Sequence, residues 1–533
     1  MKTQEVAICL SGGGFRAAAF HLGTLSYLSH LRMADGRTFL SMVNTMSTIS
    51  GGTITGLWYV AGLCKGLDDD QSFKALYQKL QSVDIPTVSL ESFVRNQKDV
   101  HSFIKLITDV YDELFFKNET FGLILDNMDK IHVHHFSANG TDFSYALPFR
   151  YQATKAIDNA KEEYKYGLVG NNYNMIPRDI ARQIRLSEIL ATSSCFPGGF
   201  EPLVFPTDFK LSSNEKNSEY VKSIQPIGLM DGGIVDNQGL EYVEHAEKQL
   251  ECNDTEAKFR NTIDLIIASD VASPYMEAYK ANSFSGMKNV SINALMHNFY
   301  IAAILMIAAD IASLGYIGTF WTGVLTTLSF FSLVAAILVH ILRHKVDDML
   351  EKSPVGKCKK SIRKLTVNTV INLLTNRATS LMMLTNTVFM KHIRRLSYGK
   401  MYDNKRWTNR LIMNAIYELR PGESWQSRYE NKRLAEWMKP SELIQQNSKK
   451  AADMGTTLWF TDEDKSNGMP EAIVAAGQYN ICWNLLAYIE RLEHNNLNTD
   501  ETHELIIKCK DQLIEDWTKF KEDPMWLFKE KIG

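Results

Sequence analysis

Three short motifs in the first half of the chain contain residues that could carry out acyl transfer. A serine on a sharp turn can attack a carbonyl carbon, a nearby carboxylate can take the serine proton, and converging backbone amides can stabilise the oxyanion that forms. A fold that brings these groups together would make a nucleophilic active site. The motifs are Ser11-Gly12-Gly13-Gly14-Phe15-Arg16, Thr48-Ile49-Ser50-Gly51-Gly52 and Met230-Asp231-Gly232-Gly233.

The glycine loop, residues 11–16, lies between the apolar run Val6 to Leu10 and a helix predicted from Ala17 to Leu31. Glycines at such a turn let backbone N–H groups point into one small space, and the helix adds the positive end of its dipole. We therefore expect the loop to hold a developing negative charge. Two alternatives stay open from these residues alone: the loop also satisfies the dinucleotide fingerprint Gly-x-Gly-x-x-Ala, and a glycine turn can serve only close helix–sheet packing.

Ser50 lies at a second turn of this kind, between a strand-like run and a helix-like run. A nucleophile elbow needs small residues around its serine, because the turn from strand to helix crowds the backbone while it lifts the hydroxyl above the sheet. Gly51 and Gly52 meet this need, and Thr48 stands where a glycine is usual. An ordinary helix N-cap, in which Ser followed by Gly is common, is the alternative.

Asp231 is the candidate base for Ser50. It ends a short apolar run before two glycines, so its carboxylate could take the serine proton if the two oxygens are about 2.6–3.2 Å apart. A simple Asp-Gly-Gly turn is the alternative. Histidines offer no comparable base, since His21 falls on the first predicted helix and His132 and His134 share one face of a predicted strand. No nearby carboxylate or cysteine completes a metal site with them, and we expect neither a metal ion nor an organic cofactor.

The composition is that of a folded protein without a strong charge bias. The 533 residues are 45% hydrophobic and 22% charged, and the formal net charge is -3, which excludes a disordered chain and a nucleic-acid binder driven by charge. Seven cysteines without a CxxC pair argue against a disulfide framework or a structural zinc site and favour a reducing compartment. The first apolar run is too short for a signal peptide, so we expect the catalytic part to stay in the cytoplasm.

Strand-like runs alternate with helix-like runs before residue 291. This alternation predicts an α/β fold with a mainly parallel central sheet and helices on both faces. After residue 345 the chain is mostly helical, with one further strand-like piece. The predicted strands are Val6 to Leu10, Phe39 to Thr45, Lys130 to Phe136, Ile263 to Ser269 and Thr456 to Phe460.

One segment, Phe299 to Leu342, is far more apolar than the rest. Its 44 residues contain no Lys or Arg, one carboxylate, Asp310, and one histidine, His340. One bilayer crossing needs about 20 apolar residues, so this length predicts two crossings joined by a tight turn. We place the two transmembrane helices at Leu295 to Leu314 and Trp321 to Leu342. A helical hairpin buried in a large soluble core is the alternative.

Charged residues around this hairpin predict its orientation. Between Arg343 and Lys364 there are eight Lys or Arg and three Asp or Glu, and Lys288 precedes the first helix. Basic residues collect on the cytoplasmic side of membrane helices, so both flanks are expected there. The sequence therefore predicts a multi-pass membrane protein with two helices and a catalytic domain that faces the cytoplasm. Asp310 would lie near the far interface or form a polar contact between hairpins of an oligomer.

In their order along the chain, the three motifs resemble those of the patatin-like phospholipases. The resemblance covers Val6 to about Asp270 and includes the small-residue segment Ala191 to Pro202. Less specifically, Met454 to Phe460 and Gly477 to Tyr488 look like the last strand and closing helix of some bacterial members. The resemblance implies a patatin-like catalytic domain at 1–290, a transmembrane hairpin inserted at 291–345, and a mostly helical part at 346–533 whose end completes the catalytic domain.

The resemblance also implies the roles of the site residues. It makes Ser50 the nucleophile and Asp231 the base of a Ser–Asp dyad, with the amides of Gly13, Gly14 and Phe15 as oxyanion donors. We therefore expect a membrane-anchored serine lipid acyl hydrolase that acts on membrane phospholipid or lysophospholipid, without a nucleic-acid partner and with room for an oligomer. The alternatives are a catalytically silent membrane scaffold or pore-forming effector and, less favoured, a dinucleotide-binding oxidoreductase.

Overall fold

The computed structural model describes most of the chain, and its residues form two compact units. The larger unit comprises Met1–Met276 and Thr385–Gly533, and the smaller unit comprises Glu277–Leu384. The smaller unit is longer than the hairpin expected at 291–345, and the C-terminal part expected at 346–533 is divided between the two units. The described residues are 5–82, 84–95, 102–155, 167–212, 216, 218–253, 263–272, 279–281, 283–285, 290–313, 316, 318–351, 364–404, 407, 409–422, 425–426, 434–494 and 506–533.

Within the described residues, ten strands form one mixed sheet. Five neighbouring strands are parallel and run in the order β10, β9, β1, β2, β3. The other pairs are antiparallel, and short hairpins connect β3 to β4 and β5 to β6. The α/β class is confirmed, whereas the sheet is mixed rather than mainly parallel. The strands are β1 (Val6–Leu10), β2 (Val43–Ile49), β3 (His135–Asp142), β4 (Leu147–Thr154), β5 (Val169–Gly170), β6 (Met175–Ile176), β7 (Leu203–Phe205), β8 (Ile227–Asp231), β9 (Leu265–Asp270) and β10 (Leu411–Ala415).

Two strands begin later than predicted. β2 begins at Val43, because Leu40–Met42 forms a turn of 3-10 helix before it. In the segment Lys130 to Phe136, predicted as a strand, only His135 and Phe136 belong to β3. Lys130 lies in a turn, where its amide bonds back to the Asn127 carbonyl. β3 begins at His135, one residue after the His134 amide bonds the Asn44 carbonyl. The strand-like runs therefore indicated these two strands, while the local structure before each of them sets where it begins.

Helices cover both faces of the sheet, and β1 shows this by the alternation of its side chains. Val6, Ile8 and Leu10 belong to the main apolar core, with α1 (Gly14–His30), α2 (Gly51–Cys64) and α20 (Met469–His494). Ala7 and Cys9 point the other way, into a second core with α11 (Leu240–Asn253) and α16 (Met390–Asp403). β1 is buried on both sides, which explains its continuous apolar run.

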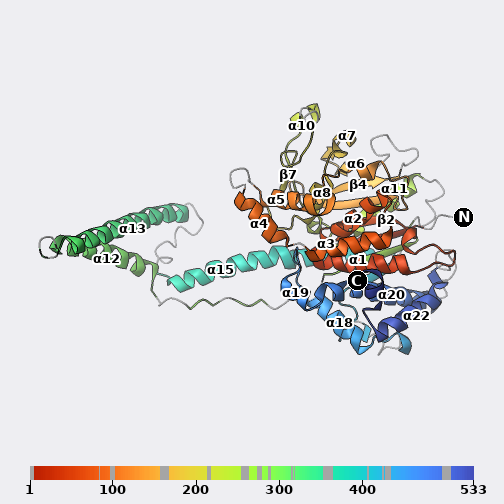
Figure 1. Cartoon of the computed structure of the whole chain (residues 1–533). Helices are drawn as coiled ribbons and strands as arrows, with labels where there is room; N and C mark the ends of the chain where they lie inside the picture. Colours follow the sequence, from red (N-terminus) through yellow and green to blue (C-terminus); the bar gives the residue numbers. More distant parts are fainter. Residues whose placement is uncertain are drawn as a thin grey trace. The chain divides into compact units, whose positions relative to one another are not determined.

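The C-terminal helices complete the larger unit. α20 packs along α1 and contacts β10, and Figure 1 shows α20 beside α1. Two glycines permit this close approach. A Cβ atom on Gly477 would lie 2.0 Å from the Phe20 carbonyl oxygen, and one on Gly23 would lie 1.9 Å from the Val474 carbonyl oxygen. The residues that follow the smaller unit therefore share one core with the first strands.

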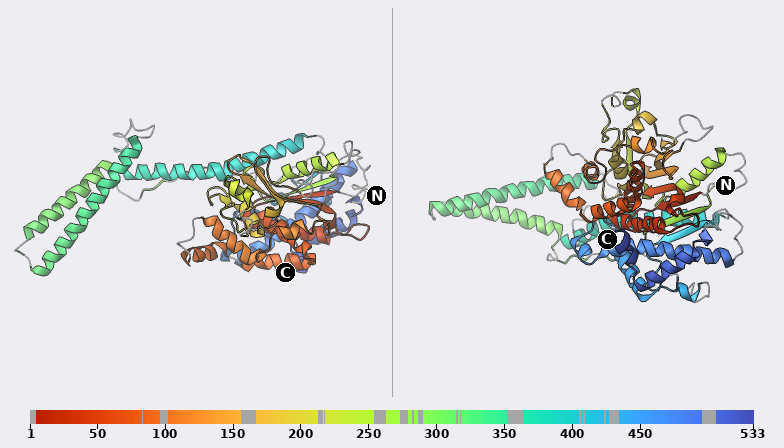
Figure 2. Two further views of the ribbon diagram at one scale, coloured as in Figure 1. Left: turned by 90° about the horizontal axis from the view of Figure 1, so that it is seen from above. Right: turned by 45° about the vertical axis from the view of Figure 1, so that its right-hand side comes forward.

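The smaller unit contains a pair of long apolar helices, α12 (Ile292–Ser313) and α13 (Thr319–Glu351), and a third helix, α15 (Val367–Met383). α12 and α13 lie side by side as a hairpin (Figure 2). Both are long and apolar enough to cross a membrane, and most of their side chains are exposed. The Thr326 hydroxyl of α13 donates to Asp310 Oδ1 of α12 at 3.0 Å, so this carboxylate has a partner inside the hairpin.

Gly477→Ala is expected to destabilise the larger unit by about 1–3 kcal/mol, because the added methyl group must push α20 away from α1. Gly399→Ala is the matched control, since it also adds a methyl group to a helix but at a position with no described atom within 4 Å. That control should be neutral or stabilise by about 0.5–1 kcal/mol. Urea unfolding of both variants in detergent measures the difference, and equal stabilities would contradict the close helix packing.

Candidate active site

The pairing of β3 brings Ser50 and Asp231 together. β2 is parallel to β3 and ends with Ile49 opposite Asn139. β8 is antiparallel to β3 and ends with Asp231 opposite Gly140, the next residue of β3. β4 occupies the other edge of β3 along its whole length, so β2 and β8 share one edge and meet end to end. The turns that follow the two strands therefore lie next to each other.

Ser50 occupies the sharp turn between β2 and α2. Its φ of 50° and ψ of -119° are angles that residues other than glycine rarely adopt. Ser193 of α8 (Leu186–Ser194) holds this turn, because its hydroxyl accepts the Ser50 amide at 2.9 Å and donates to the Asn139 carbonyl at 2.8 Å. The Ser50 side chain makes no capping bond to α2. This geometry favours a nucleophile elbow over a helix N-cap.

Thr48, the departure from the usual elbow sequence, is accommodated by Gly56 of α2. The Thr48 side chain is fully buried, and its methyl carbon would lie 2.3 Å from a Cβ atom at position 56. The Thr48 hydroxyl donates to the Ser137 carbonyl at 3.2 Å and accepts from the Thr53 hydroxyl at 3.1 Å. The side chain of Thr48 thus fits at this position because Gly56, on the helix that follows, has no side chain.

Asp231 is buried beside Ser50, and only 3% of it is exposed. Its Oδ1 accepts the Gly233 amide at 2.7 Å. Burial raises the pKa of the Asp231 carboxyl to about 7, while hydrogen bonds from Gly233 and from the Ser50 hydroxyl lower it less strongly. A carboxyl that titrates near neutral pH can both accept a proton and return it, as a general base must. A simple surface turn would not bury the carboxyl in this way.

The glycine loop connects β1 to α1 and lies against the Ser50 turn. Gly13 has φ 146° and Gly14 has φ 61°, backbone angles that favour glycine. A Cβ atom on Gly51 would lie 2.1 Å from the Gly14 carbonyl oxygen and 2.8 Å from the Gly14 nitrogen, so the backbone of Gly14 is next to the serine turn. The Gly12 amide already donates to the Asn237 carbonyl at 3.2 Å. Gly13 and Gly14 are therefore the candidate oxyanion donors.

The Phe15 amide, expected to be an oxyanion donor, already has a hydrogen-bond partner. It donates to the Thr457 carbonyl at 2.7 Å, because the first amides of a helix need partners from outside the helix. This amide is occupied, and Phe15 is not retained among the candidate oxyanion donors. The strand predicted at Thr456 to Phe460 is wrong, because this segment forms no regular strand. Its backbone binds the start of α1 instead of a sheet edge.

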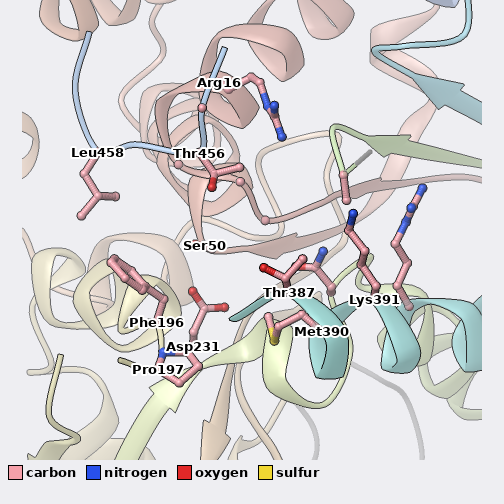
Figure 3. A pocket seen from close by; sticks show the side chains of 17 residues that line it. Arg16, Ser50, Phe196, Pro197, Asp231, Thr387, Met390, Lys391, Thr456 and Leu458 are labelled. Atoms are coloured by element: carbon pink, nitrogen blue, oxygen red, sulfur yellow. The ribbon is translucent and has the colours of Figure 1, made fainter. Parts of the chain in front are cut away.

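The three turns open into one cavity of about 460 Å³. In Figure 3, Phe196 and Leu458 lie on one side of Ser50, and Thr387 and Lys391 lie on the other. The residues from α16 were missed by the sequence analysis, because they follow the smaller unit and form no motif. The described lining residues are Gly12, Gly13, Gly14, Arg16, Ser50, Phe196, Pro197, Asp231, Asn237, Ala272, Thr387, Met390, Lys391, Arg394, Gly455, Thr456 and Leu458.

The histidines do not line the described part of this cavity. His21 is buried and bonded through Nδ1 to the Ser269 hydroxyl at 2.9 Å, and burial lowers its pKa to about 4. His132 and His134 precede β3 and do not share a strand face, which corrects that prediction. Among the residues that the structure describes, no group of three His, Cys, Asp or Glu side chains could hold a metal ion.

Together these features define an α/β protein with a serine on a strained strand-to-helix turn, a buried carboxyl and a glycine loop in one cavity. Residues 8–243 match the family described as patatin-like phospholipase. This part of the chain is therefore a patatin-like phospholipase domain, as the order of the motifs predicted. The match includes Ser50, Asp231 and the glycine loop and ends before α16.

Solved structures similar to this chain include human GIVD cytosolic phospholipase A2, with 15% identity, a TM-score of 0.33, and coverage of 51% of this chain and 44% of that chain. The same human enzyme in complex with methyl gamma-linolenyl fluorophosphonate matches with 13% identity, a TM-score of 0.30, and coverage of 51% of this chain and 41% of that chain. The aligned part thus spans less than half the length of these structures. No curated protein sequence matches the chain significantly.

The raised pKa of Asp231 leads us to expect a pH dependence for the reactivity of Ser50. Below about pH 7 the carboxyl is protonated and cannot accept the serine proton, so labelling of Ser50 by a fluorophosphonate probe should slow about tenfold per pH unit. The rate should level off above about pH 8. Labelling followed from about pH 5 to 9 measures this, and a flat profile would contradict a role for Asp231 as base.

Proposed function

We propose that the protein is a membrane-anchored serine lipid acyl hydrolase that cleaves ester bonds of phospholipids or lysophospholipids through Ser50 and Asp231. The family match supports lipid acyl hydrolysis as the general class of activity. The finer proposal rests on one observation, that Ser50 on its strained turn lies beside a buried carboxyl with a pKa near 7. The reaction needs neither a metal ion nor an organic cofactor.

In the first half of the reaction, the Ser50 hydroxyl oxygen attacks the ester carbonyl carbon while its proton passes to Asp231. The carbonyl oxygen becomes an oxyanion, which the amides of Gly13 and Gly14 stabilise. Collapse of this intermediate breaks the bond to the alcohol oxygen, and Asp231 returns the proton to that oxygen. The products of this half are a lysolipid or free alcohol and an acyl group on Ser50.

In the second half, water replaces the alcohol. Asp231 takes a proton from the water molecule, whose oxygen attacks the acyl carbon, and the oxyanion forms again at the glycine loop. Ser50 leaves with the proton held by Asp231, and a fatty acid is released. One carboxyl thus serves as base and then as acid in each half, a role that suits a pKa near the working pH.

The walls of the cavity suit a lipid. Phe196, Pro197, Met390 and Leu458 supply apolar surface next to Ser50, and an acyl chain would bury its methylene groups against them. A cavity of about 460 Å³ is within the range of small-molecule sites, about 300–1,000 Å³. This surface favours a fatty acyl ester over a small polar ester.

The membrane part of the proposal rests on α12 and α13, two adjacent helices of sufficient length and apolar character to cross a bilayer. Two crossings return the chain to the side from which it left, so the larger unit can contain residues from both sides of the hairpin. We propose that this side is the cytoplasm. The basic residues Lys357, Lys359, Lys360 and Arg363, which favour that orientation, lie outside the described residues.

Ser50→Ala and Asp231→Asn are each expected to lower phospholipid hydrolysis by roughly 10³-fold or more, because both side chains act in one proton transfer. For the same reason the double variant should lose no more activity than either single variant. Fatty acid release from phospholipid vesicles measures all three. Ser194→Ala is a matched control, since this neighbouring hydroxyl bonds the Leu190 carbonyl within α8 and does not line the cavity.

Two results would count against this assignment. Near-normal turnover by Asp231→Asn would show that another group accepts the serine proton. Full activity of Ser50→Ala would show that the nucleophile lies elsewhere. Circular dichroism spectra and melting temperatures close to those of the wild type are needed for each variant, so that a loss of activity is not a loss of fold.

Replacing residues 295–342 with a short Gly/Ser bridge is expected to separate membrane anchoring from chemistry. The shortened protein should leave the membrane fraction and still cleave dispersed short-chain esters, because the site lies in the larger unit. Its hydrolysis of bilayer lipid should fall at least about tenfold, since the anchor no longer holds it at the bilayer. Fractionation and both assays test this, with Ser50→Ala in the shortened protein as the control. Recovery of the full-length protein without detergent would contradict the topology.

A further inference from the structure

One wall of the cavity contains basic side chains that take no part in the proposed hydrolytic steps. Lys391 and Arg394 lie one turn apart on α16, and Arg16 lies at the start of α1; all three line the cavity with Ser50. Among the described lining residues, Asp231 is the one acidic side chain. α16 is outside the segment that matches the family, so this wall comes in large part from the chain's own C-terminal part.

Two arginines anchor this wall to the sheet. Arg394 Nε donates to Asp270 Oδ2 at 2.7 Å, a buried ion pair at the end of β9, and Arg394 Nη2 donates to the Tyr417 hydroxyl at 3.1 Å. Arg16 Nη2 donates to the Val271 carbonyl at 3.0 Å. Asp270 acts electrostatically on both arginines. One carboxylate therefore faces two guanidinium groups, and the wall keeps a positive charge.

Lys391 adds a further positive charge to this wall. Its side chain is half-buried, and burial together with the charges of Arg394, Arg395 and Arg16 lowers the pKa of its ammonium group. Cations gathered in a partly desolvated cavity repel one another, and an anion that binds among them relieves this repulsion. In Figure 3, Lys391 and the apolar side chain of Leu458 lie on opposite sides of Ser50. The cavity thus has a basic wall and an apolar wall with the serine between them.

We propose that Lys391 binds the phosphate group of the substrate headgroup and so makes the site selective for phospholipids over uncharged glycerides. This inference rests on the proposed hydrolase function and names its substrate class. The scissile ester lies at Ser50, its acyl chain lies against Phe196 and Leu458, and the phosphate lies at Lys391. A glycerophospholipid has this arrangement, because only a few bonds separate its ester carbonyls from its phosphate. A lysine suits such contact, since its ammonium is a compact charge with three donors.

The test compares two substrates with the same acyl chains, dioleoylphosphatidylglycerol and dioleoylglycerol, presented to the full-length protein in the same neutral detergent micelles. The quantity measured is the ratio of kcat/KM for the phospholipid to kcat/KM for the glyceride. Lys391→Met should lower this ratio at least about tenfold, mainly through KM for the phospholipid, whereas Lys391→Arg should keep most of it. Lys400→Met is the matched control, because Lys400 lies on the same helix, is exposed and pairs with Glu244. It should leave the ratio unchanged.

Different outcomes would contradict the headgroup contact and the proposed hydrolase function. A wild type that hydrolyses neither substrate would overturn the proposed function. An active wild type whose ratio is unchanged in Lys391→Met, or a variant that loses both activities equally, would overturn the headgroup contact alone. Adding inorganic phosphate at constant ionic strength tests whether the site binds the phosphate of a lipid headgroup or free phosphate. We expect phosphate to compete with the phospholipid for the site. If phosphate instead activates glyceride hydrolysis, and Lys391→Met abolishes this activation, the site binds free phosphate.

Discussion

The site depends on one constraint, that β3 must pair with two strands of opposite direction along a single edge. β2 pairs with the first part of β3 and β8 pairs with its last part. Each strand ends in a turn that has its own support, the Ser193 hydroxyl for Ser50 and the Gly233 amide for Asp231. Neither turn can shift without loss of its pairing on β3. A serine and a carboxylate can therefore keep one relative position without a histidine between them.

The C-terminal part of the chain supports and encloses this arrangement. α20 packs against α1, the helix that follows the glycine loop, and the Thr457 carbonyl satisfies the Phe15 amide at the start of that helix. α16 contributes Lys391 and Arg394 to the cavity. The residues assigned to bond cleavage thus lie in the segment that matches the family, whereas much of the surface that would contact substrate comes from residues after it.

Local features were predictable from the sequence, and pairings between distant segments were not. The motifs around Ser50 and Asp231 are visible because sharp turns restrict residue type, and the apolar helices α12 and α13 are visible because their composition is a local property. The antiparallel half of the sheet was missed, since several of its strands are too short to show alternation. The occupied Phe15 amide depends on Thr457, a residue from the far end of the chain, and no local pattern reveals such a contact.

The place of the smaller unit in the chain sets the order in which the candidate active site can form during synthesis. The smaller unit separates β9 from β10, which are adjacent parallel strands of the sheet. The ribosome therefore releases Ser50 and Asp231 first, then the apolar helices α12 and α13, and only later α16, Thr457 and α20. Until those last elements emerge, the glycine loop lacks its support and the cavity lacks a wall. The two apolar helices thus leave the ribosome before the cavity around Ser50 is complete.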